Sequence, residues 1–314
     1  MRILITGGSG YVGSILIPRL LKNKHHIINI DTQWFGHYLK NHPRLINYKM
    51  DYSSIDKIKD KNIDVVIHLA SIANDPMAEI DKNLSWETSA LNTYRLMEFM
   101  KKRKIKKILY ASSGSVYGIK KEKKVTENSK LEPISLYNKV KMVTERIILS
   151  YQKDIIPFII RPSTVCGFSP RMRLDLTVNI LTFSALKHNI INVFGGKQIR
   201  PNIHIEDMCR IYEFFLNKGK AFSGIYNAGY ENKSIIEIAK TVSKITKSKI
   251  KVIKDKNDPR SYKLNSDKIQ SIGFKSTKNY VDAINELCEQ YKNKKLKDRK
   301  NNFSLKWLKK ILKK

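Results

Sequence analysis

The stretch RILITGGSGYVG, from Arg2 to Gly13, decides the fold class. A short apolar run typical of a buried strand leads through Gly7 and Gly10 to Gly13, and an apolar-periodic segment typical of a helix follows. Glycine lets the backbone turn tightly and approach a ligand closely. The N-terminus of the following helix presents free N–H groups and the positive end of its dipole. The loop therefore suits a diphosphate group.

An acidic residue closes the next predicted strand. Asp31 lies 18 residues after Gly13, close to the ~20 residues expected between such a glycine loop and a ribose-binding carboxylate. An aspartate there would accept hydrogen bonds from ribose hydroxyls and repel a 2′-phosphate. Thr32 and Gln33 follow it, rather than arginine. We therefore predict NAD, not NADP, as the cofactor. The alternative is a purely structural glycine turn with a capping aspartate.

Strand-like and helix-like segments alternate through the first half of the chain. The strand-like runs are almost continuously Ile, Val and Leu, which is typical of a parallel sheet covered by helices on both faces. We predict an α/β fold, a Rossmann-type doubly wound parallel sheet. The predicted strands are Arg2–Thr6, His26–Asp31, Leu45–Lys49, Asp64–Leu69, Lys107–Ala111 and Ile155–Arg161, and the predicted helices are Tyr11–Lys22, Leu84–Arg103 and Ser135–Lys153.

The pattern becomes less regular after about residue 165. Helices are expected near 174–188, 205–217, 234–246 and 279–291, interleaved with short strands. This predicts a smaller C-terminal substrate lobe interwoven with the first unit. We expect an NAD-binding domain in 1–165 with a returning segment near 200–218, a substrate-binding lobe in 166–291 and a basic amphipathic tail in 292–314. Without a Pro/Gly-rich linker, the body should form one compact unit ending near residue 292.

The chain is strongly basic, with 60 Lys and Arg against 28 Asp and Glu in 314 residues and a formal net charge of +32. The lysines of the body are dispersed and no aromatic-plus-basic RNA-binding motif occurs, so no specific nucleic-acid partner is expected. The three cysteines suggest neither a disulfide framework nor a zinc site, and no metal is expected. With no apolar leader and no apolar run of ~18 residues, we expect a cytoplasmic protein.

The tail is an amphipathic basic segment. FSLKWLKKILKK, residues 303–314, separates apolar from lysine side chains when placed on a helix. It could make weak contact with a membrane surface, dock on the body of the protein or fray in solution.

Several motifs in order resemble the extended short-chain dehydrogenases/reductases, a family of nucleotide-sugar epimerases, dehydratases and reductases. The resemblance runs from Arg2 to about residue 290. Its motifs are TGGSGYVG (6–13), Asp31, MDYSS with Asp51, HLAS (68–71), SSGSVYG (112–118), YNKVK (137–141), RPSTVCG (161–167), RPNIHIEDM (200–208) and DPRSYKLNSDKI (258–269).

The resemblance implies a cofactor site. Asp51 would read the adenine amino group, and the end of the HLAS strand would lie beside the diphosphate and the nicotinamide ribose. His68 of that motif is expected to be a packed structural histidine. The residues implied for the cofactor are Gly7, Gly10, Tyr11, Val12, Gly13, Asp31, Asp51, Tyr52, Leu69, Ala70, Ser71, Tyr137 and Lys141.

The resemblance also implies a catalytic set, Ser113, Tyr137 and Lys141. Tyr137 and Lys141 are four residues apart, so on a helix they share one face. An alcohol must lose its proton as hydride leaves its carbon, but a tyrosine with an ordinary pKa near 10 is a poor base at neutral pH. A nearby ammonium favours the phenolate. Lys141 could supply this charge and hold the nicotinamide ribose, while Ser113 would bond the reacting oxygen.

Residues that resemble the family's substrate contacts are spread over the chain. Two arginines suit a nucleotide diphosphate because guanidinium pairs bidentately with phosphate oxygens. A surface ion pair with Glu206 or Asp207 is the alternative for one of them, Arg200. The candidate substrate-binding residues are Asn74, Ser113, Ser115, Asn179, Arg200 and Arg260.

Departures from the family pattern reduce the number of activities that the resemblance leaves open. The 4,6-dehydratases carry an Asp-Glu pair where this chain has Gly114 and Ser115, so that dehydration is disfavoured. Thr164 stands where an asparagine is common, and Ser89 replaces another. Cys166 is a candidate proton donor.

We therefore expect an NAD-dependent nucleotide-diphosphate-sugar epimerase acting at C4. A 4-dehydrogenase or 4-ketoreductase is the alternative, and a non-catalytic NAD-binding regulator is the alternative from another class. The resemblance also implies a homodimer through helices 84–103 and 135–153.

Overall fold

The computed structural model describes residues 1–314 except 121, 123, 254–260, 262 and 314. A seven-stranded sheet with the order β10-β6-β5-β4-β1-β2-β3 forms its centre, and every pair in it is parallel. Its strands are β1 (Arg2–Thr6), β2 (His26–Asp31), β3 (Leu45–Lys49), β4 (Val65–His68), β5 (Lys107–Ala111), β6 (Ile156–Pro162) and β10 (Gly224–Ala228). The predicted doubly wound parallel sheet is confirmed.

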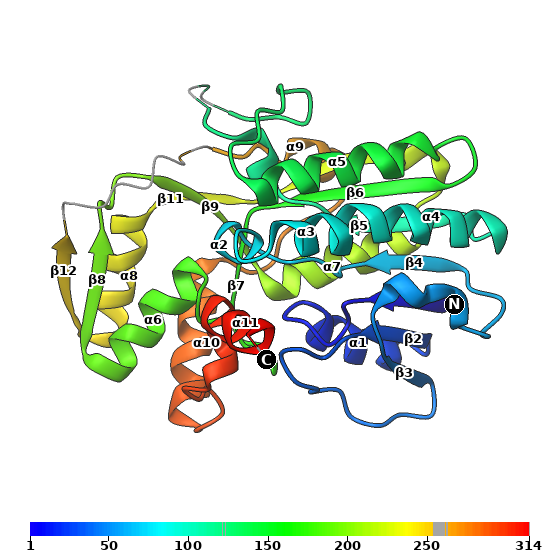
Figure 1. Ribbon diagram of the computed structural model, residues 1–314. Coiled ribbons are helices and arrows are strands. Elements are labelled where there is room, and N and C mark those ends of the chain that lie inside the picture. The colour runs from blue at the N-terminus through cyan, green and yellow to red at the C-terminus, as the bar shows by residue number, and fades with distance from the viewer. Residues whose placement is uncertain (121, 123, 254–260, 262, 314) are drawn as a thin grey trace.

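Alternate residues of the strands pack into two apolar layers, one on each face of the sheet. Ile3 and Ile5 of β1 pack with α1 (Gly13–Lys22) and α7 (Ile205–Leu216) on one face. Leu4 lies in the opposite layer, because successive side chains of a strand point to opposite faces. That layer is covered by α4 (Asn92–Lys102) and α5 (Leu136–Ser150), which run along the sheet in Figure 1.

The predicted helix 84–103 is not one regular helix. It is divided into α3 (Lys82–Trp86), a π-helical turn (Glu87–Leu91) and α4. Two carbonyls in the turn accept side-chain hydrogen bonds: that of Thr88 from the Tyr52 hydroxyl and that of Ser89 from the Thr93 hydroxyl. Such bonds compete with the regular helical ladder. The first bond joins residues that are far apart in the sequence, and the second joins residues four positions apart. Hydrophobic periodicity reveals neither of them.

The second half of the chain builds a smaller lobe beside the carboxyl ends of the large sheet (Figure 1). Helices α6, α8 and α10 enclose its apolar core. The chain also returns to the first unit, because α7 packs on α1 and β10 joins β6. The lobe consists of β7 (Thr164–Cys166), β9 (Ile199–His204), β11 (Glu231–Ser234), β8 (Ile190–Phe194), β12 (Lys249–Ile253), α6 (Thr177–His188), α8 (Ile235–Thr246) and α10 (Tyr280–Lys292). The short helix α9 (Asp267–Ser271) instead packs on β10 of the large sheet.

The tail docks on the body, so the expectation that the compact unit ends near residue 292 is wrong. Helix α11 (Ser304–Leu312) lies between the lobe and the edge of the large sheet (Figure 1). The Leu308 side chain is fully buried there, and the Trp307 indole donates to the Trp34 carbonyl at 2.6 Å. The helix thus turns apolar side chains toward the protein, which is the docking alternative, while Lys309 stays exposed.

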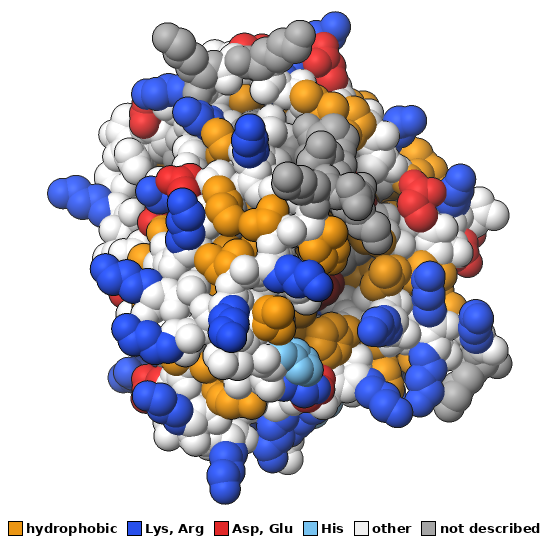
Figure 2. Space-filling view, turned by 90° about the vertical axis from the view of Figure 1, so that its left-hand side faces the viewer, with side chains coloured by type: hydrophobic (Ala, Val, Ile, Leu, Met, Phe, Trp, Pro, Cys, Tyr) orange, Lys and Arg blue, Asp and Glu red, His pale blue; other side chains and the backbone are white. Residues whose placement is uncertain are grey.

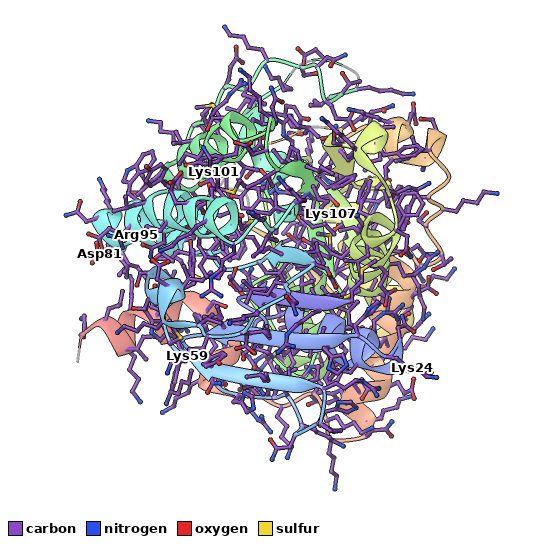
Figure 3. All side chains as sticks on the ribbon, turned by 90° about the vertical axis from the view of Figure 1, so that its right-hand side faces the viewer. Lys24, Lys59, Asp81, Arg95, Lys101 and Lys107 are labelled. Carbon is purple, nitrogen blue, oxygen red and sulfur yellow. The ribbon has the colours of Figure 1, made fainter. Side chains whose placement is uncertain are left out.

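The positive charges are spread over the surface. Lys and Arg side chains are scattered over the face in Figure 2 rather than gathered in one patch. In Figure 3, Lys24 and Arg95 lie at opposite margins of another face. Among the described residues, no helix has the length and apolar composition that crossing a membrane requires.

Candidate functional site

A cavity of about 560 Å³ lies at the carboxyl ends of the large sheet's strands. The smaller lobe and α11 complete its walls, through residues such as Arg200 and Leu308. Carboxyl ends of parallel strands are the usual place for a ligand in open α/β sheets. All thirteen residues predicted for the cofactor line this cavity.

The glycine loop leaves no room for side chains at two positions. Gly7 has φ +75°, and a Cβ there would lie 2.6 Å from the Ala70 backbone nitrogen. A Cβ on Gly13 would lie 2.4 Å from the Gly8 carbonyl oxygen. Close packing of β1, the loop and α1 therefore requires glycine. The loop backbone and the N-terminal end of α1 face the cavity, as a diphosphate site needs.

Asp31 is positioned at the end of β2 by two backbone amides. Its carboxylate accepts hydrogen bonds from Ser9 N at 2.9 Å and from Gln33 N at 2.6 Å. Burial raises the pKa of Asp31, and these two bonds together with the nearby Arg171 act in the opposite direction. The half-buried carboxylate lines the cavity, where a ribose hydroxyl could bind it.

Asp51 and Tyr52 form the adjoining wall. The Asp51 carboxylate caps the turn that follows, accepting from Ser53 N at 2.7 Å, and it also accepts from the Asn92 amide at 3.3 Å. The buried Tyr52 hydroxyl donates to the Thr88 carbonyl. Both residues are thereby held at the cavity edge by α4 and the π turn.

Ser113, Tyr137 and Lys141 converge on one end of the cavity. The Ser113 and Ser115 hydroxyls are 2.7 Å apart, and the Ser115 hydroxyl donates to the Asn138 side-chain oxygen at 2.6 Å. The Ser113 hydroxyl also hydrogen-bonds Tyr137. The tyrosine is thus coupled to the serine expected to bond the reacting oxygen.

The charges around Tyr137 differ in part from the prediction. Burial raises the pKa of Tyr137 to about 12, while its bond with Ser113 and the Arg173 guanidinium lower it and Asp75 raises it. Burial lowers the pKa of Lys141 to about 7. The Lys141 ammonium lies 5.9 Å from the centre of the Tyr137 ring and donates to the Ala111 carbonyl at 2.7 Å. In this structure the Arg173 guanidinium therefore acts on the phenol as well, beside the Lys141 ammonium that contacts its ring.

A buried ion pair connects helix α5, which carries Tyr137 and Lys141, to the large sheet. Arg161 and Glu145, both 2% exposed, pair at 2.6 Å. Glu145 also accepts a hydrogen bond from Ser112, next to Ser113. The network ties α5 to the strands β5 and β6.

His68 is structural, as expected. It is fully buried, and its ring nitrogens lie 2.6 Å from the Thr6 hydroxyl and 2.9 Å from the Thr93 hydroxyl. Burial lowers the pKa of His68 to about 3, so the ring is neutral.

The predicted substrate residues divide into three groups. Asn74, Ser113, Ser115 and Arg200 line the cavity. Arg260 lies outside the described residues. Asn179 does not line the cavity, so its predicted substrate contact is not supported by its position.

The Asn179 side chain is occupied inside the protein. It is fully buried, accepts from Gly167 N at 3.0 Å, and donates to the Tyr11 hydroxyl at 3.0 Å and to the Arg173 carbonyl at 2.9 Å. The suggestion that Cys166 donates a proton is wrong for a similar reason. Its fully buried thiol lies outside the cavity, and burial raises its pKa.

Sequence reasoning missed part of the cavity wall. The loop before α6 contributes Arg171, Arg173 and Asp175, and Arg173 pairs with Asp175 at 2.8 Å. Asp175 accepts from the Asn74 amide at 2.9 Å, which joins the loop to α2 (Asp75–Ala78). Two arginines and an aspartate at alternate positions of RMRLD were the available signal. The other missed lining residues include Trp34, Phe35, Ser304, Leu305 and Leu308.

The residues present fit a dinucleotide. The loop near Gly7 offers backbone rather than side chains to a diphosphate, and Asp31 offers an acceptor to a ribose. The buried Nε of Arg171 has no hydrogen-bond partner in the described protein, so this donor is available to an anionic group bound in the same cavity.

Comparison with known proteins agrees with this geometry. A family model, described as the NAD dependent epimerase/dehydratase family, matches residues 3–229. The chain is 27% identical over 312 residues to the UDP-glucose 4-epimerase of Lactobacillus helveticus, covering 90% of this chain and 94% of that protein. It is 30% identical over 223 residues to a putative UDP-glucose 4-epimerase of Methanocaldococcus jannaschii, covering 68% and 73%.

Solved structures share the fold over nearly the whole chain. The UDP-glucuronic acid 4-epimerase of Bacillus cereus, in complex with UDP-glucuronic acid and NAD, has a TM-score of 0.79 at 26% identity, covering 93% of this chain and 99% of that one. The UDP-N-acetylglucosamine 4-epimerase of Methanobrevibacter ruminantium has a TM-score of 0.84 at 20% identity, covering 93% and 98%. Because the family model covers well over half of the chain, the chain belongs to the NAD dependent epimerase/dehydratase family and is an NAD-dependent enzyme.

Proposed function

We propose that the protein is an NAD-dependent 4-epimerase of a nucleotide-diphosphate sugar. The observation that carries the proposal is the convergence of Ser113, Tyr137 and Lys141 on one cavity with the glycine loop and Asp31. A proton-transfer group and a dinucleotide-binding edge then share one enclosed space. The relatives named as UDP-sugar 4-epimerases support the same function and make UDP-sugars the first substrates to test.

Each catalytic side chain has a definite task in this proposal. The glycine loop, Asp31 and Lys141 would hold NAD, which would supply reversible hydride transfer. Tyr137 takes the proton of the C4 hydroxyl and gives it back, and Ser113 holds the reacting oxygen by a hydrogen bond. Lys141 holds the nicotinamide ribose. The charge of Arg173 lowers the pKa of Tyr137 against the larger effect of burial, which supports a role for it in stabilising the phenolate.

An epimerase is favoured over a dehydrogenase because no feature of the chain calls for an external redox partner. The keto sugar would turn within the cavity and take hydride on its other face. The absence of carboxyl groups at Gly114 and Ser115 speaks against the 4,6-dehydratases. Arg200, Asn74 and Ser115 are the proposed substrate contacts, and Arg260 remains a proposed diphosphate contact.

The wider setting follows from this proposal. We assign NAD binding to 1–165 with the returning segment near 200–218, and substrate binding to 166–291. A cytoplasmic enzyme of carbohydrate biosynthesis that acts as a homodimer through α4 and α5 would fit this function.

The test is Tyr137→Phe in the full chain. Turnover of UDP-glucose to UDP-galactose, or of another UDP-sugar that wild type converts, should fall by about 10²- to 10⁴-fold, the usual contribution of a proton-transfer group. NAD affinity should remain. Tyr291→Phe, which changes a tyrosine outside the cavity, serves as the control. Turnover within about tenfold of wild type, against that expected loss, would show that Tyr137 is not the acid/base.

Absorbance separates the alternatives. An epimerase returns the hydride, so NADH does not accumulate with turnover, whereas a 4-dehydrogenase accumulates it stoichiometrically. If calorimetry shows binding of NAD but of no nucleotide sugar, the non-catalytic regulator replaces the enzyme.

A further inference from the structure

Arg171 is a buried cation in the wall of the cavity. The residue is only 4% exposed, and its guanidinium carbon lies 4.2 Å from the centre of the Phe35 ring. Its Nη2 donates to the Ser304 hydroxyl at 3.0 Å, and its Nη1 donates to the Met172 carbonyl at 3.3 Å. Phe35 follows β2, and Ser304 opens α11. Arg171 therefore bridges the two sides of the cavity near the end of β2.

Among the described residues, no carboxylate forms an ion pair with Arg171, and its buried Nε has no hydrogen-bond partner. Asp175 and Asp31 act on its charge only from a longer distance. Arg173, two residues on, is paired with Asp175 at 2.8 Å. Burial is the main cause that lowers the pKa of Arg171 to about 10. A buried cation of this kind needs an anion to offset its lost hydration.

The two arginines act on different groups that line the cavity. Arg173 acts electrostatically on Tyr137, at the proposed reacting end. Arg171 acts on Asp31, at the proposed ribose end. Their loop is tied to the glycine loop, because the Tyr11 hydroxyl donates to the Gly167 carbonyl at 2.6 Å. Arg171 thus faces the part of the site where the cofactor, not the sugar, would bring its charge.

We propose that Arg171 binds the diphosphate of NAD, and that Ser304 positions its guanidinium for this contact. The C-terminal helix α11 is then part of the cofactor site, with Leu305 and Leu308 as its apolar wall. The diphosphate is the anionic group of NAD, and guanidinium can pair bidentately with its oxygens. This inference rests on the cofactor site of the proposed function and not on the identity of the sugar.

The experiment is calorimetry of the nucleotide-free full chain with NAD, ADP, adenosine and UDP. Arg171→Met should weaken NAD and ADP by about 10- to 100-fold, as expected for a charged hydrogen bond, and leave adenosine within about twofold, because that arm lacks the charge-assisted contact. Arg171→Lys should restore part of the loss, because it keeps the charge but not the fork. Ser304→Ala should weaken the same ligands by a smaller factor.

The control is Lys309→Ala, which changes an exposed lysine of α11. An equal loss for adenosine would mean that Arg171 only shapes the pocket, and a loss for UDP alone would move it to the substrate; either result overturns the proposal. Unchanged NAD affinity in Arg171→Met overturns it too. If wild type itself does not bind NAD, the proposed function fails as well.

Thermal unfolding gives an independent readout. Removing an unpaired buried cation should raise the melting temperature of the nucleotide-free protein in Arg171→Met. Saturating NAD should then add less stability to the variant than to wild type, because its affinity is lower. An equal NAD-induced shift in both proteins would contradict the contact.

Discussion

Lys141 is the residue at which the site conflicts most clearly with stability. The residue is 3% exposed, its ammonium donates to the Ala111 carbonyl at 2.7 Å, and the nearby Glu145 raises its pKa. Burial outweighs this effect and lowers the pKa of Lys141 from 10.5 to about 7. The folded state therefore binds this proton less readily than the unfolded chain. The destabilisation of the folded state by the buried Lys141 ammonium is therefore greatest below pH 7. It decreases as the pH rises from 7 toward 10.5.

Lys141→Met should accordingly change stability in a pH-dependent way. The free energy of unfolding of the variant, relative to wild type, should be most favourable at pH 6 and should decline steadily to pH 9, since the wild type regains stability over that range. Chemical denaturation of the cofactor-free proteins at both values measures it.

Lys139→Met on the same helix is the matched control, because Lys139 is exposed. It should show no such pH dependence. A Lys141→Met advantage that stayed constant or grew toward pH 9 would mean that the ammonium is not disfavoured by burial.

At the residue scale, the site residues that could be predicted are those that belong to short sequence motifs. The resemblance implied Tyr137 and Lys141, which share a helical face, and the spacing from the glycine loop indicated Asp31; all three line the cavity. Arg171 and Arg173 lie in an irregular loop, and only the fold brings them to the cavity. Asn179 was misassigned because its amide meets partners far away in sequence, such as Tyr11.

At the scale of elements, the junction of β1 with α1 depends on backbone contact. The helix starts at Gly13, whose missing Cβ allows the approach to the Gly8 carbonyl. A methyl group there would meet backbone, which cannot move aside as a side chain could. To avoid this clash, the helix would have to shift, and its N-terminal end would then move away from the diphosphate site.

Gly13→Ala should therefore lower both the melting temperature and the NAD affinity, the latter by at least about tenfold if one good phosphate contact is lost. Gly219→Ala is the control, since a Cβ there meets nothing within 4 Å. Differential scanning fluorimetry with and without NAD compares them. Equal behaviour of the two variants would show that the close approach at Gly13 does not matter.

Strands such as β1, β2 and β5 were predictable because most of their residues are buried and apolar. β1, β2, β3 and β5 begin and end at the predicted residues. The helix predicted at 84–103 was interrupted by side-chain bonds to its carbonyls, which periodicity does not contain. The sequence left β10 without assignment, because its residues, GIYNA, do not form a continuous run of Ile, Val and Leu.

For the whole molecule, the exposed face of α4 supports the proposed dimer. Leu91 is 46% and Tyr94 48% exposed, next to Trp86 at 36%. On α5, in contrast, the apolar Val140 is buried. The apolar surface that a partner could cover is thus provided mainly by the π turn and α4.

The double variant Leu91→Lys/Tyr94→Lys should convert a dimer into a monomer at micromolar concentration, because it places charges at the centre of the proposed interface. Sedimentation equilibrium measures the mass. Val252→Lys, equally exposed at 48% on β12, should leave the mass unchanged. A wild type that is already monomeric, or a double variant that remains dimeric, contradicts the interface.

The sequence by itself determined the family, the parallel sheet, the NAD site and the position of the catalytic helix. These rest on local patterns: strands buried on both faces, a glycine loop, and residues one helical turn apart. The tertiary structure decided the rest. It brought Arg171 and Arg173 to the cavity, placed Asn179 and Cys166 outside it, and folded α11 over it. These outcomes depend on contacts such as Arg171 with Ser304, 133 residues apart, which no local pattern encodes.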